Sequence, residues 1–526
     1  MSKGITRREF VAGTVAGTAA LALAGNPLYS SAWAAESVKR GGVWRYARNR
    51  TTPSLDPHRV SEFFTCIVGM YDCLVDVVTD PKTSESKLVP CLATEWHTEK
   101  NNKRLVFTLR KGVVFHDGSK FDASVAKWNL DRMRLHPKSF LANDIKEIES
   151  VDVVNANTVA INLKSPSAGL IYNLSTARTL SGMVSKSFQE KYGDDELVRK
   201  GCGTGAFRYK NWIVDEKVVL ERFPDYWRKG ADGKTLPYLD GIEEHYRPKI
   251  DQAVLDLRSG GLDTVHFPPP REVAKIKESS DLLYIEMPPF EYHDVCCGFN
   301  PRKAPFNSLE LRRACCYAID RARFAKITGF GVTRPHQYPN IAAGQPGWSP
   351  KDWPDYSYNP EKAKELVKAA YPQGVTVNVS VISREPDTTY GELLKAMWDA
   401  VGIKTELKAT ERLEWIQNMK KDNFEIGFWQ GASYIGGFCR EKFVSKSPGN
   451  WSNISVPQVD KLLDEHNETA SEPKRHELMK NALKIVFDQA LVTSATALTQ
   501  AVGTHKKVKG LRSNFRTLVA SEVWLA

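Results

Sequence analysis

Strand-like apolar runs alternate with helical runs along nearly the whole of this 526-residue chain. The clearest case is the strand pattern Val375–Ile382, followed by a helical pattern that includes Leu393 and Trp398, then Gly402 and a second strand pattern at Ile403–Leu407. A strand, a helix and a strand in this order predict a right-handed β-α-β unit with parallel strands. The same alternation elsewhere predicts an α/β fold class.

Two hairpins are expected in the first half of the chain. Turn residues separate Ile148–Val154 from Thr158–Leu163, and a second pair of strand patterns runs from Phe207 to Ile213 and from Val218 to Glu221. A further strand over Leu105–Leu109 precedes a turn and an amphipathic helix from about Asp122 to Leu135. The first half therefore mixes antiparallel strands with helices.

The second half contains clear helix starts. Asn307 and Glu310 fit the cap and third position of a helix whose apolar side includes Cys315. Asn359 is expected to cap a second helix, with Pro360 at its first position. These signals support the α/β assignment.

Length and charge exclude several classes. A chain of 526 residues predicts two to four domains, and 42% hydrophobic with 26% charged residues is typical of a globular protein. The net charge of +11 becomes +9 without the first 34 residues, which hold three basic residues and one acid. The tightest basic cluster is Lys506, Lys507 and Lys509. Because basic and acidic residues otherwise alternate, we expect no nucleic-acid partner.

The N-terminus reads as an export signal. Residues Thr6–Val11, with Arg7 and Arg8 side by side, precede a short apolar run that ends at Ala32-Trp33-Ala34. This pattern resembles a bacterial twin-arginine signal, with an ordinary secretory signal as the alternative. We expect a signal peptide over 1–34 and a periplasmic protein without a lipid anchor, because no cysteine follows the apolar run.

Nine cysteines are present, and two pairs of them are adjacent in sequence. Helical spacing makes Cys315 a core residue, and Cys66 and Cys73 also lie in apolar surroundings. The chain has no C-x-x-C motif, so a zinc or iron–sulfur site is not supported. We expect free, buried thiols.

Motifs for catalysis are missing. The Gly-rich segment 201–205 lacks the spacing of a dinucleotide-binding loop and is followed by a strand pattern, so we interpret it as a turn. His116-Asp117-Gly118 is interpreted as an Asp-Gly turn rather than as half of a catalytic pair. We therefore expect no catalytic residue, no metal site and no cofactor.

Several segments, in order along the chain, resemble landmarks of the family 5 solute-binding proteins of ABC importers, the group that binds oligopeptides, dipeptides and nickel chelates. These segments are Leu55-Asp56-Pro57, Leu92–Trp96, Phe107–Gly118, Gly203–Phe207, Tyr317–Arg321 and Tyr358–Ala363. Their order extends over most of the chain that follows the signal peptide.

The resemblance implies a two-lobed periplasmic binding protein fold, type II and cluster C-like. The larger lobe would comprise residues 35–296 with an extra subdomain at 61–200, the smaller lobe 297–494, and the segment 495–526 would return to the larger lobe. Crossing strands near Tyr292–Phe299 and Leu491–Leu498 would form the hinge. Such a protein captures a small-molecule ligand between its lobes and delivers it to a membrane permease, without catalysis and as a monomer.

The resemblance also implies where the ligand binds. Pocket groups of the family map to eight residues here: Phe63, Lys138, Phe140, Arg178, His336, Arg384, Trp429 and Tyr434. The aromatic residues would form flat walls, and Arg178 or Arg384 would bind a carboxylate or phosphate. Core packing is the alternative for each aromatic residue, and a solvated surface or an ion pair for each arginine.

One departure from the family concerns the substrate. Peptide binders place an aspartate in the segment that corresponds to Phe428–Phe438, where it neutralises the peptide ammonium, but this chain has no acid there. A neutral or anionic ligand, such as an organic acid, an opine-like compound or a metal chelate, is therefore expected rather than an ordinary peptide. Two other classes remain open: a periplasmic enzyme or redox protein exported by the twin-arginine route, and a peptide-binding chaperone on the same fold.

Overall fold

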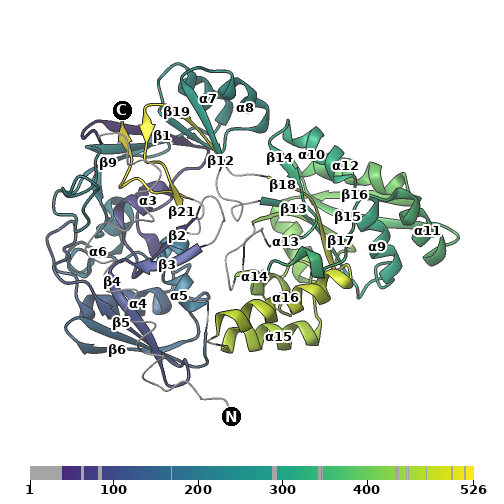
Figure 1. Cartoon of the computed structure of the whole chain (residues 1–526), viewed down its shortest axis with the longest axis horizontal. Coiled ribbons are helices and arrows are strands. Elements are labelled where there is room, and N and C mark those ends of the chain that lie inside the picture. Colours follow the sequence, from purple (N-terminus) through teal and green to yellow (C-terminus); the bar gives the residue numbers. More distant parts are fainter. Residues whose placement is uncertain are drawn as a thin grey trace, which may run out of the picture.

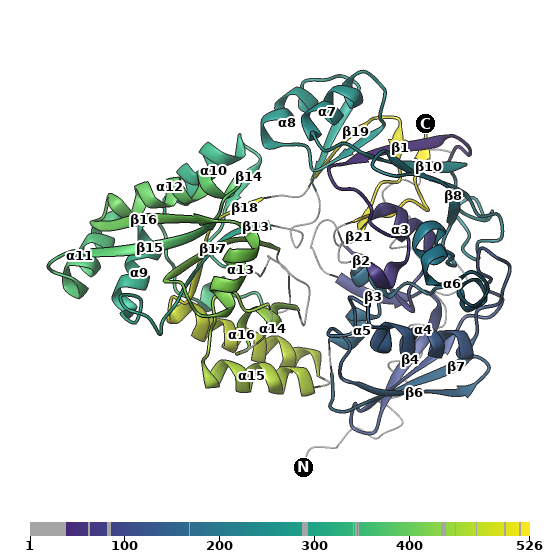
Figure 2. The same ribbon diagram turned by 180° about the vertical axis from the view of Figure 1, so that it is seen from behind.

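The computed structural model describes residues 38–526 except 61–63, 81–85, 168, 287–292, 340, 342–344, 346, 433–437, 446, 448, 470, 499–500 and 515–516. The predicted signal peptide, Phe63 and Tyr434 lie outside the described residues. The chain forms two lobes that lie side by side (Figure 1; Figure 2 shows the opposite side). This arrangement confirms the expected two-lobed α/β fold.

A seven-stranded mixed sheet forms the centre of the larger lobe. In spatial order its strands are β12 (Leu282–Glu286), β19 (Ala501–His505), β11 (Thr264–His266), β1 (Val43–Arg48), β10 (Gly241–Tyr246), β9 (Lys217–Arg222) and β8 (Phe207–Ile213). The accompanying helices are α3 (Thr65–Met70), α7 (Ile250–Arg258) and α8 (Pro270–Lys277). The predicted hairpin of β8 and β9 is confirmed, because the two strands pair antiparallel.

A second, four-stranded sheet belongs to the same lobe, in the order β4 (Ala93–Glu99), β5 (Arg104–Leu109), β7 (Thr158–Leu163) and β6 (Ile148–Asn155). Near it lie β2 (Val75–Thr79), β3 (Ser86–Pro90), α4 (Ala123–Leu135), α5 (Leu170–Asn173), the 3-10 turn η2 (Thr176–Ser181) and α6 (Lys186–Lys200). Asp122 caps α4, since its carboxylate accepts hydrogen bonds from the N–H groups of Ser124 and Val125 at 2.8 and 3.0 Å. The predicted hairpin of β6 and β7 and the predicted helix are both confirmed.

The Gly-rich segment before β8 serves close backbone packing. A Cβ atom on Gly203 would lie 2.1 Å from the carbonyl oxygen of Met70, and one on Gly205 would lie 2.4 Å from the carbonyl carbon of Met70. Only glycine permits this approach. The segment is therefore structural, as its sequence context indicated.

The C-terminal residues complete the larger lobe with short strands: β20 (Val508–Lys509), β21 (Ser513–Asn514), β22 (Thr517–Leu518) and β23 (Trp524–Leu525). Leu518, Val523 and Trp524 are buried in the same apolar core as Trp44 and Tyr46 of β1. The end of the chain is thus packed into the lobe in which the described residues begin (Figure 1).

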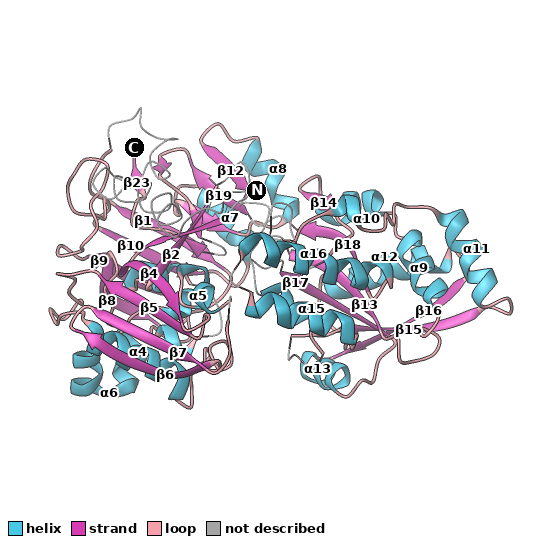
Figure 3. Cartoon of the chain, turned by 60° about the horizontal axis from the view of Figure 1, so that its bottom comes forward, coloured by secondary structure: helices cyan, strands magenta, loops and turns pink. Residues whose placement is uncertain are grey.

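A six-stranded sheet forms the smaller lobe, in the order β14 (Thr333–Pro335), β18 (Val492–Leu498), β13 (His293–Phe299), β17 (Ile426–Ala432), β15 (Val375–Ile382) and β16 (Ile403–Thr410). Its helices are α9 (Leu309–Ala318), α10 (Arg321–Gly329), α11 (Pro360–Ala370), α12 (Asp387–Asp399), α13 (Arg412–Lys420), α14 (Phe438–Phe443), α15 (Pro457–Glu468) and α16 (Glu472–Asp488). Cys296 and Cys297 are neighbours in β13 and therefore point to opposite faces of the sheet. Each lies in a separate apolar core, and helices cover both faces (Figure 3).

The local predictions for this lobe are confirmed with one exception. β15 and β16 pair in parallel, and Asn359 caps α11 by accepting a hydrogen bond from the N–H of Lys362 at 3.0 Å. The cap of α9, however, is Ser308 and not Asn307, because the Ser308 hydroxyl accepts the hydrogen bond from the N–H of Leu311 at 3.2 Å. Asn307 lies one residue before the cap.

Strand β13 pairs with β17 over its whole length and with β18 at five of its seven residues. The boundaries of the lobes and of the extra subdomain stay predictions. The eight cysteines that the structure describes are buried, and Cys66, Cys73 and Cys315 are free thiols, which confirms the expectation for these three residues. Within the described ranges, no helix combines the length and apolarity that a membrane span requires.

Candidate functional site

The parallel strands of the larger lobe end on the side where the chain passes to the smaller lobe. Strands β10 and β11 run parallel to β1, and β11 and β12 both pair antiparallel with β19, so these four strands share one direction. β12 ends at Glu286, just before the residues that lead to β13. The carboxyl ends of β1, β10 and β11 therefore point toward the smaller lobe.

The smaller lobe has the matching arrangement. β13 enters from the larger lobe at His293, whose backbone pairs with Ala432 at the carboxyl end of β17. Strands β15 and β16 run parallel to each other, and β15 is parallel to β17. In α/β sheets, ligands bind outside the carboxyl ends of parallel strands. The candidate site consequently lies where the two sets of carboxyl ends face each other (Figure 1).

Contacts between the described residues of the two lobes include one beside the strands that connect the lobes and one farther from them. Arg334 of β14 forms an ion pair with Glu286 at the end of β12, beside the strands that connect the lobes. Farther from those strands, the Asn467 side-chain amide of α15 donates a hydrogen bond of 3.2 Å to the carbonyl oxygen of Pro166. Both contacts join residues of different lobes directly.

Arg384 stands at the carboxyl end of β15 in the smaller lobe and is held from one side. Its Nε donates to Oδ2 of Asp387 at 2.6 Å, and the Gln430 side-chain amide donates to Oδ1 of the same carboxylate at 2.9 Å. Asp387 is only 1% exposed, whereas the Arg384 side chain is 49% exposed. Burial raises the pKa of the neighbouring Tyr390 phenol to about 12, and the negative charge of Asp387 acts in the same direction. About half of the Arg384 side chain is therefore open to solvent.

Trp429, in β17 beside Gln430, is 5% exposed, and its ring reaches Gly298 of β13, where an added Cβ would lie 2.8 Å from Cη2. Its indole Nε1 is buried without a hydrogen-bond partner in the described part of the chain. A buried N–H group without an acceptor costs about 1–3 kcal/mol. Trp429 therefore combines core packing with an unused donor.

His336 follows β14 and is partly exposed. Its Nε2 lies 2.7 Å from the carbonyl oxygen of Tyr338, and its ring lies nearly parallel to Trp348 at 6.2 Å between centroids. Burial lowers the pKa of His336 to about 4. The imidazole is therefore neutral at pH 7, and its contact with Tyr338 stabilises the loop that follows β14.

The remaining predicted residues come from the larger lobe. Lys138 and Phe140 are exposed on the loop after α4, where the N–H of Phe140 donates to the carbonyl oxygen of His58 at 3.0 Å. Arg178 lies in η2, but its side chain is outside the described atoms. Phe63 and Tyr434 lie outside the described residues. The structure thus links Arg384 through Asp387 to Gln430, and the sequence had indicated neither Asp387 nor Gln430. Trp429, the neighbour of Gln430 in β17, packs on the opposite face of the sheet.

A partly open pocket between α3, β2 and the C-terminal residues of the larger lobe has a cavity volume of about 30 Å³. Asp72 on its wall accepts hydrogen bonds from Trp227 Nε1 at 2.9 Å, Thr204 Oγ1 at 3.1 Å and the Tyr226 hydroxyl at 3.1 Å. Burial raises the pKa of Asp72. This carboxylate joins elements of the lobe and is not presented to a ligand. Among the described residues no His, Cys, Asp or Glu cluster could hold a metal ion.

Comparisons with known proteins agree with this geometry. The family model "Bacterial extracellular solute-binding proteins, family 5 Middle" matches residues 87–436. The glutathione-binding protein GsiB of Pectobacterium atrosepticum is 32% identical over 529 aligned residues, which cover 95% of each protein.

Among solved structures, HbpA2 from Haemophilus parasuis gives a TM-score of 0.80 at 22% identity. The match covers 92% of this chain and 100% of that one. DppA from Helicobacter pylori, solved in complex with the peptide STSA, gives a TM-score of 0.73 at 24% identity and covers 93% of this chain and 98% of its own. These likenesses support the fold.

Proposed function

Because the chain belongs to the bacterial extracellular solute-binding proteins of family 5, we propose that this substrate-binding component of an ABC importer captures a small anionic solute between its lobes. The observation that carries the ligand class is the Arg384 guanidinium at the smaller lobe's carboxyl edge. The Arg384 side chain is 49% exposed, and its described ion pair uses only Nε. A ligand carboxylate would accept hydrogen bonds from the remaining guanidinium nitrogens.

The charge pattern favours an anion over an ordinary peptide. Segment 428–438 has no acidic residue, and the nearby Asp387 already accepts from Arg384 and Gln430. A peptide ammonium buried here would lack a carboxylate of its own. Glutathione, the ligand named for the relative GsiB, carries two carboxylates and one ammonium, and is the first solute to test; opine-like acids and metal chelates follow.

The wider site, in this proposal, includes Arg384, Trp429, Tyr434 and His336 of the smaller lobe and Phe63, Lys138, Phe140 and Arg178 of the larger one. The lobes comprise 35–296 with the extra subdomain 61–200, 297–494, and the returning segment 495–526. A twin-arginine signal over 1–34 exports the folded protein to the periplasm, where it acts as a monomer and delivers its ligand to an inner-membrane permease.

A ligand screen tests the proposal. The melting temperature of the mature protein is measured with glutathione, opine-type acids, dipeptides, sugars and nickel chelates, since a ligand that binds only the folded state raises it. Acidic solutes should raise it, and Arg384→Ala should strongly reduce the rise while the protein stays folded. A rise produced by neutral and cationic dipeptides but not by any acid would contradict the anionic ligand class.

A further inference from the structure

We propose that Asp387 is a positioning residue that aims the Arg384 guanidinium at the ligand and connects it to the ligand-facing end of β17. The inference deepens the proposed function, because it assumes that Arg384 binds a ligand carboxylate. It concerns two residues, Asp387 and Gln430, that neither the sequence pattern nor the comparisons with relatives assign to the site.

The first step is the geometry of the ion pair. Asp387 receives Nε of Arg384 at 2.6 Å and therefore occupies the side edge of the guanidinium. The two Nη atoms lie in one plane, and the edge between them presents one hydrogen from each nitrogen, an arrangement that binds a carboxylate in a two-pronged manner. A carboxylate held at Nε thus fixes the plane and direction of the edge that remains.

The second step is the rigidity of Asp387 itself. The residue is 1% exposed and is the first residue of α12, where the backbone N–H groups and the helix dipole stabilise a negative charge. Its other oxygen, Oδ1, accepts the Gln430 amide at 2.9 Å. Both oxygens of the carboxylate are therefore fixed by separate elements.

The third step is the connection to β17. Gln430 follows Trp429 in this strand and lies two residues before its last residue, Ala432. Arg384, Asp387 and Gln430 thus form a chain of hydrogen bonds from the end of β15 through α12 to β17. Movement of Arg384 toward a ligand would be transmitted to the segment that carries Trp429.

A surface ion pair would not behave in this way. Glu361 and Lys364 of α11 have the same i, i+3 separation at 2.9 Å, but their side chains are 76% and 49% exposed. Exposed pairs of this kind contribute little, because water and salt screen them. Glu361→Gln is therefore a matched control for Asp387→Asn.

The binding test uses isothermal titration calorimetry with glutathione and with glutathione diethyl ester, in which both carboxylates are blocked. We expect Asp387→Asn to weaken glutathione binding about tenfold while ester binding changes little, so that the preference for free carboxylates falls. Gln430→Met should weaken glutathione binding about threefold, and Glu361→Gln should not change it. In an Arg384→Ala background, Asp387→Asn should have no further effect. Equal losses for acid and ester, or additive effects of the two substitutions, would overturn the positioning role.

A second measurement needs no ligand. In NMR spectra of protein labelled with 15N-arginine, an Nε–H group held by a buried carboxylate exchanges slowly with water. Arg384, assigned by its disappearance in Arg384→Lys, should give such a signal in the wild type and in Glu361→Gln but not in Asp387→Asn. Failure of glutathione to bind the wild type would count against the proposed ligand, whereas a missing or unchanged Arg384 signal would count against Asp387.

Discussion

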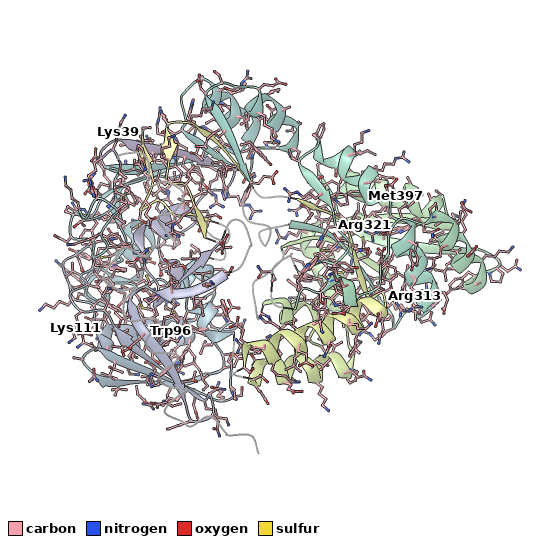
Figure 4. All side chains as sticks on the ribbon, in the orientation of Figure 1. Lys39, Trp96, Lys111, Arg313, Arg321 and Met397 are labelled. Atoms are coloured by element: carbon pink, nitrogen blue, oxygen red, sulfur yellow. The ribbon has the colours of Figure 1, made fainter. Side chains whose placement is uncertain are left out.

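Arg321 should be far more sensitive to replacement by lysine than an ordinary arginine of this protein. Figure 4 labels it inside the smaller lobe, where it is 7% exposed. Its Nε donates to the Ser494 carbonyl oxygen, Nη1 to the Tyr356 carbonyl oxygen and Nη2 to Thr493 Oγ1, each at 2.8 Å. The guanidinium therefore ties β18, which leads back to the larger lobe, to the start of α10.

The magnitude follows from the three acceptors. A lysine ammonium is a single point of donation and cannot reach acceptors arranged around a planar fork, so at least two of the three charged hydrogen bonds are lost. At about 1.5–3 kcal/mol for each such bond, Arg321→Lys should lower the free energy of unfolding by roughly 3–6 kcal/mol. Burial lowers the pKa of Arg321, because desolvation disfavours the charged form.

Urea unfolding followed by circular dichroism measures the effect, and the transition of the smaller lobe is analysed separately because two lobes need not unfold together. Arg323→Lys is the control, since Arg323 is exposed two residues farther along α10; it should change the free energy by less than about 0.5 kcal/mol. Equal unfolding midpoints for the two variants would refute the reasoning.

Three further predictions concern pH, closure and the thiols. Burial lowers the pKa of His116 to about 4 from its usual 6.5, and its Nδ1 accepts the N–H of Gly203 at 3.2 Å, so the unfolded state binds more protons between these pH values. The free energy of unfolding should therefore fall as the pH is lowered from 6.5 to 4, and it should fall less steeply in His116→Gln than in the wild type. Urea unfolding midpoints across this pH range measure the two slopes, and identical slopes would contradict the prediction. Asn467→Ala removes the hydrogen bond to Pro166 that joins the lobes, so calorimetry should give an apparent Kd about threefold higher for the solute identified by the screen; an unchanged Kd would count against a role in closure. The eight described cysteines are buried, and they should react with a thiol reagent only after denaturation; rapid reaction of several in native protein would exclude the packing described.

Local signals accounted for most of the fold that could be predicted from the sequence. Asn359 was recognised as a cap because its partner, the N–H of Lys362, lies three residues away. Asn307 was misplaced by one residue because Asn and Ser are both good caps. The choice of Ser308 is made by packing, which buries Leu311 in the core of the smaller lobe.

The candidate site was harder to predict than the fold, because its contacts join residues that are far apart in the sequence. Arg384 could be proposed because it follows a strand, but its partner Asp387 becomes apparent only once α12 is known to begin there. Gln430 lies 43 residues from Asp387, and only the parallel pairing of β15 with β17 brings the two together. Contacts of this kind depend on tertiary structure, which no local pattern encodes.

Small-angle X-ray scattering of the mature protein, with and without the acidic solute that most raises its melting temperature, tests the central claim most directly. The two-lobed account predicts a radius of gyration that decreases saturably as the solute is added, with the solute recovered chemically unchanged. An unchanged scattering profile at saturation, or a solute converted to product, would contradict it.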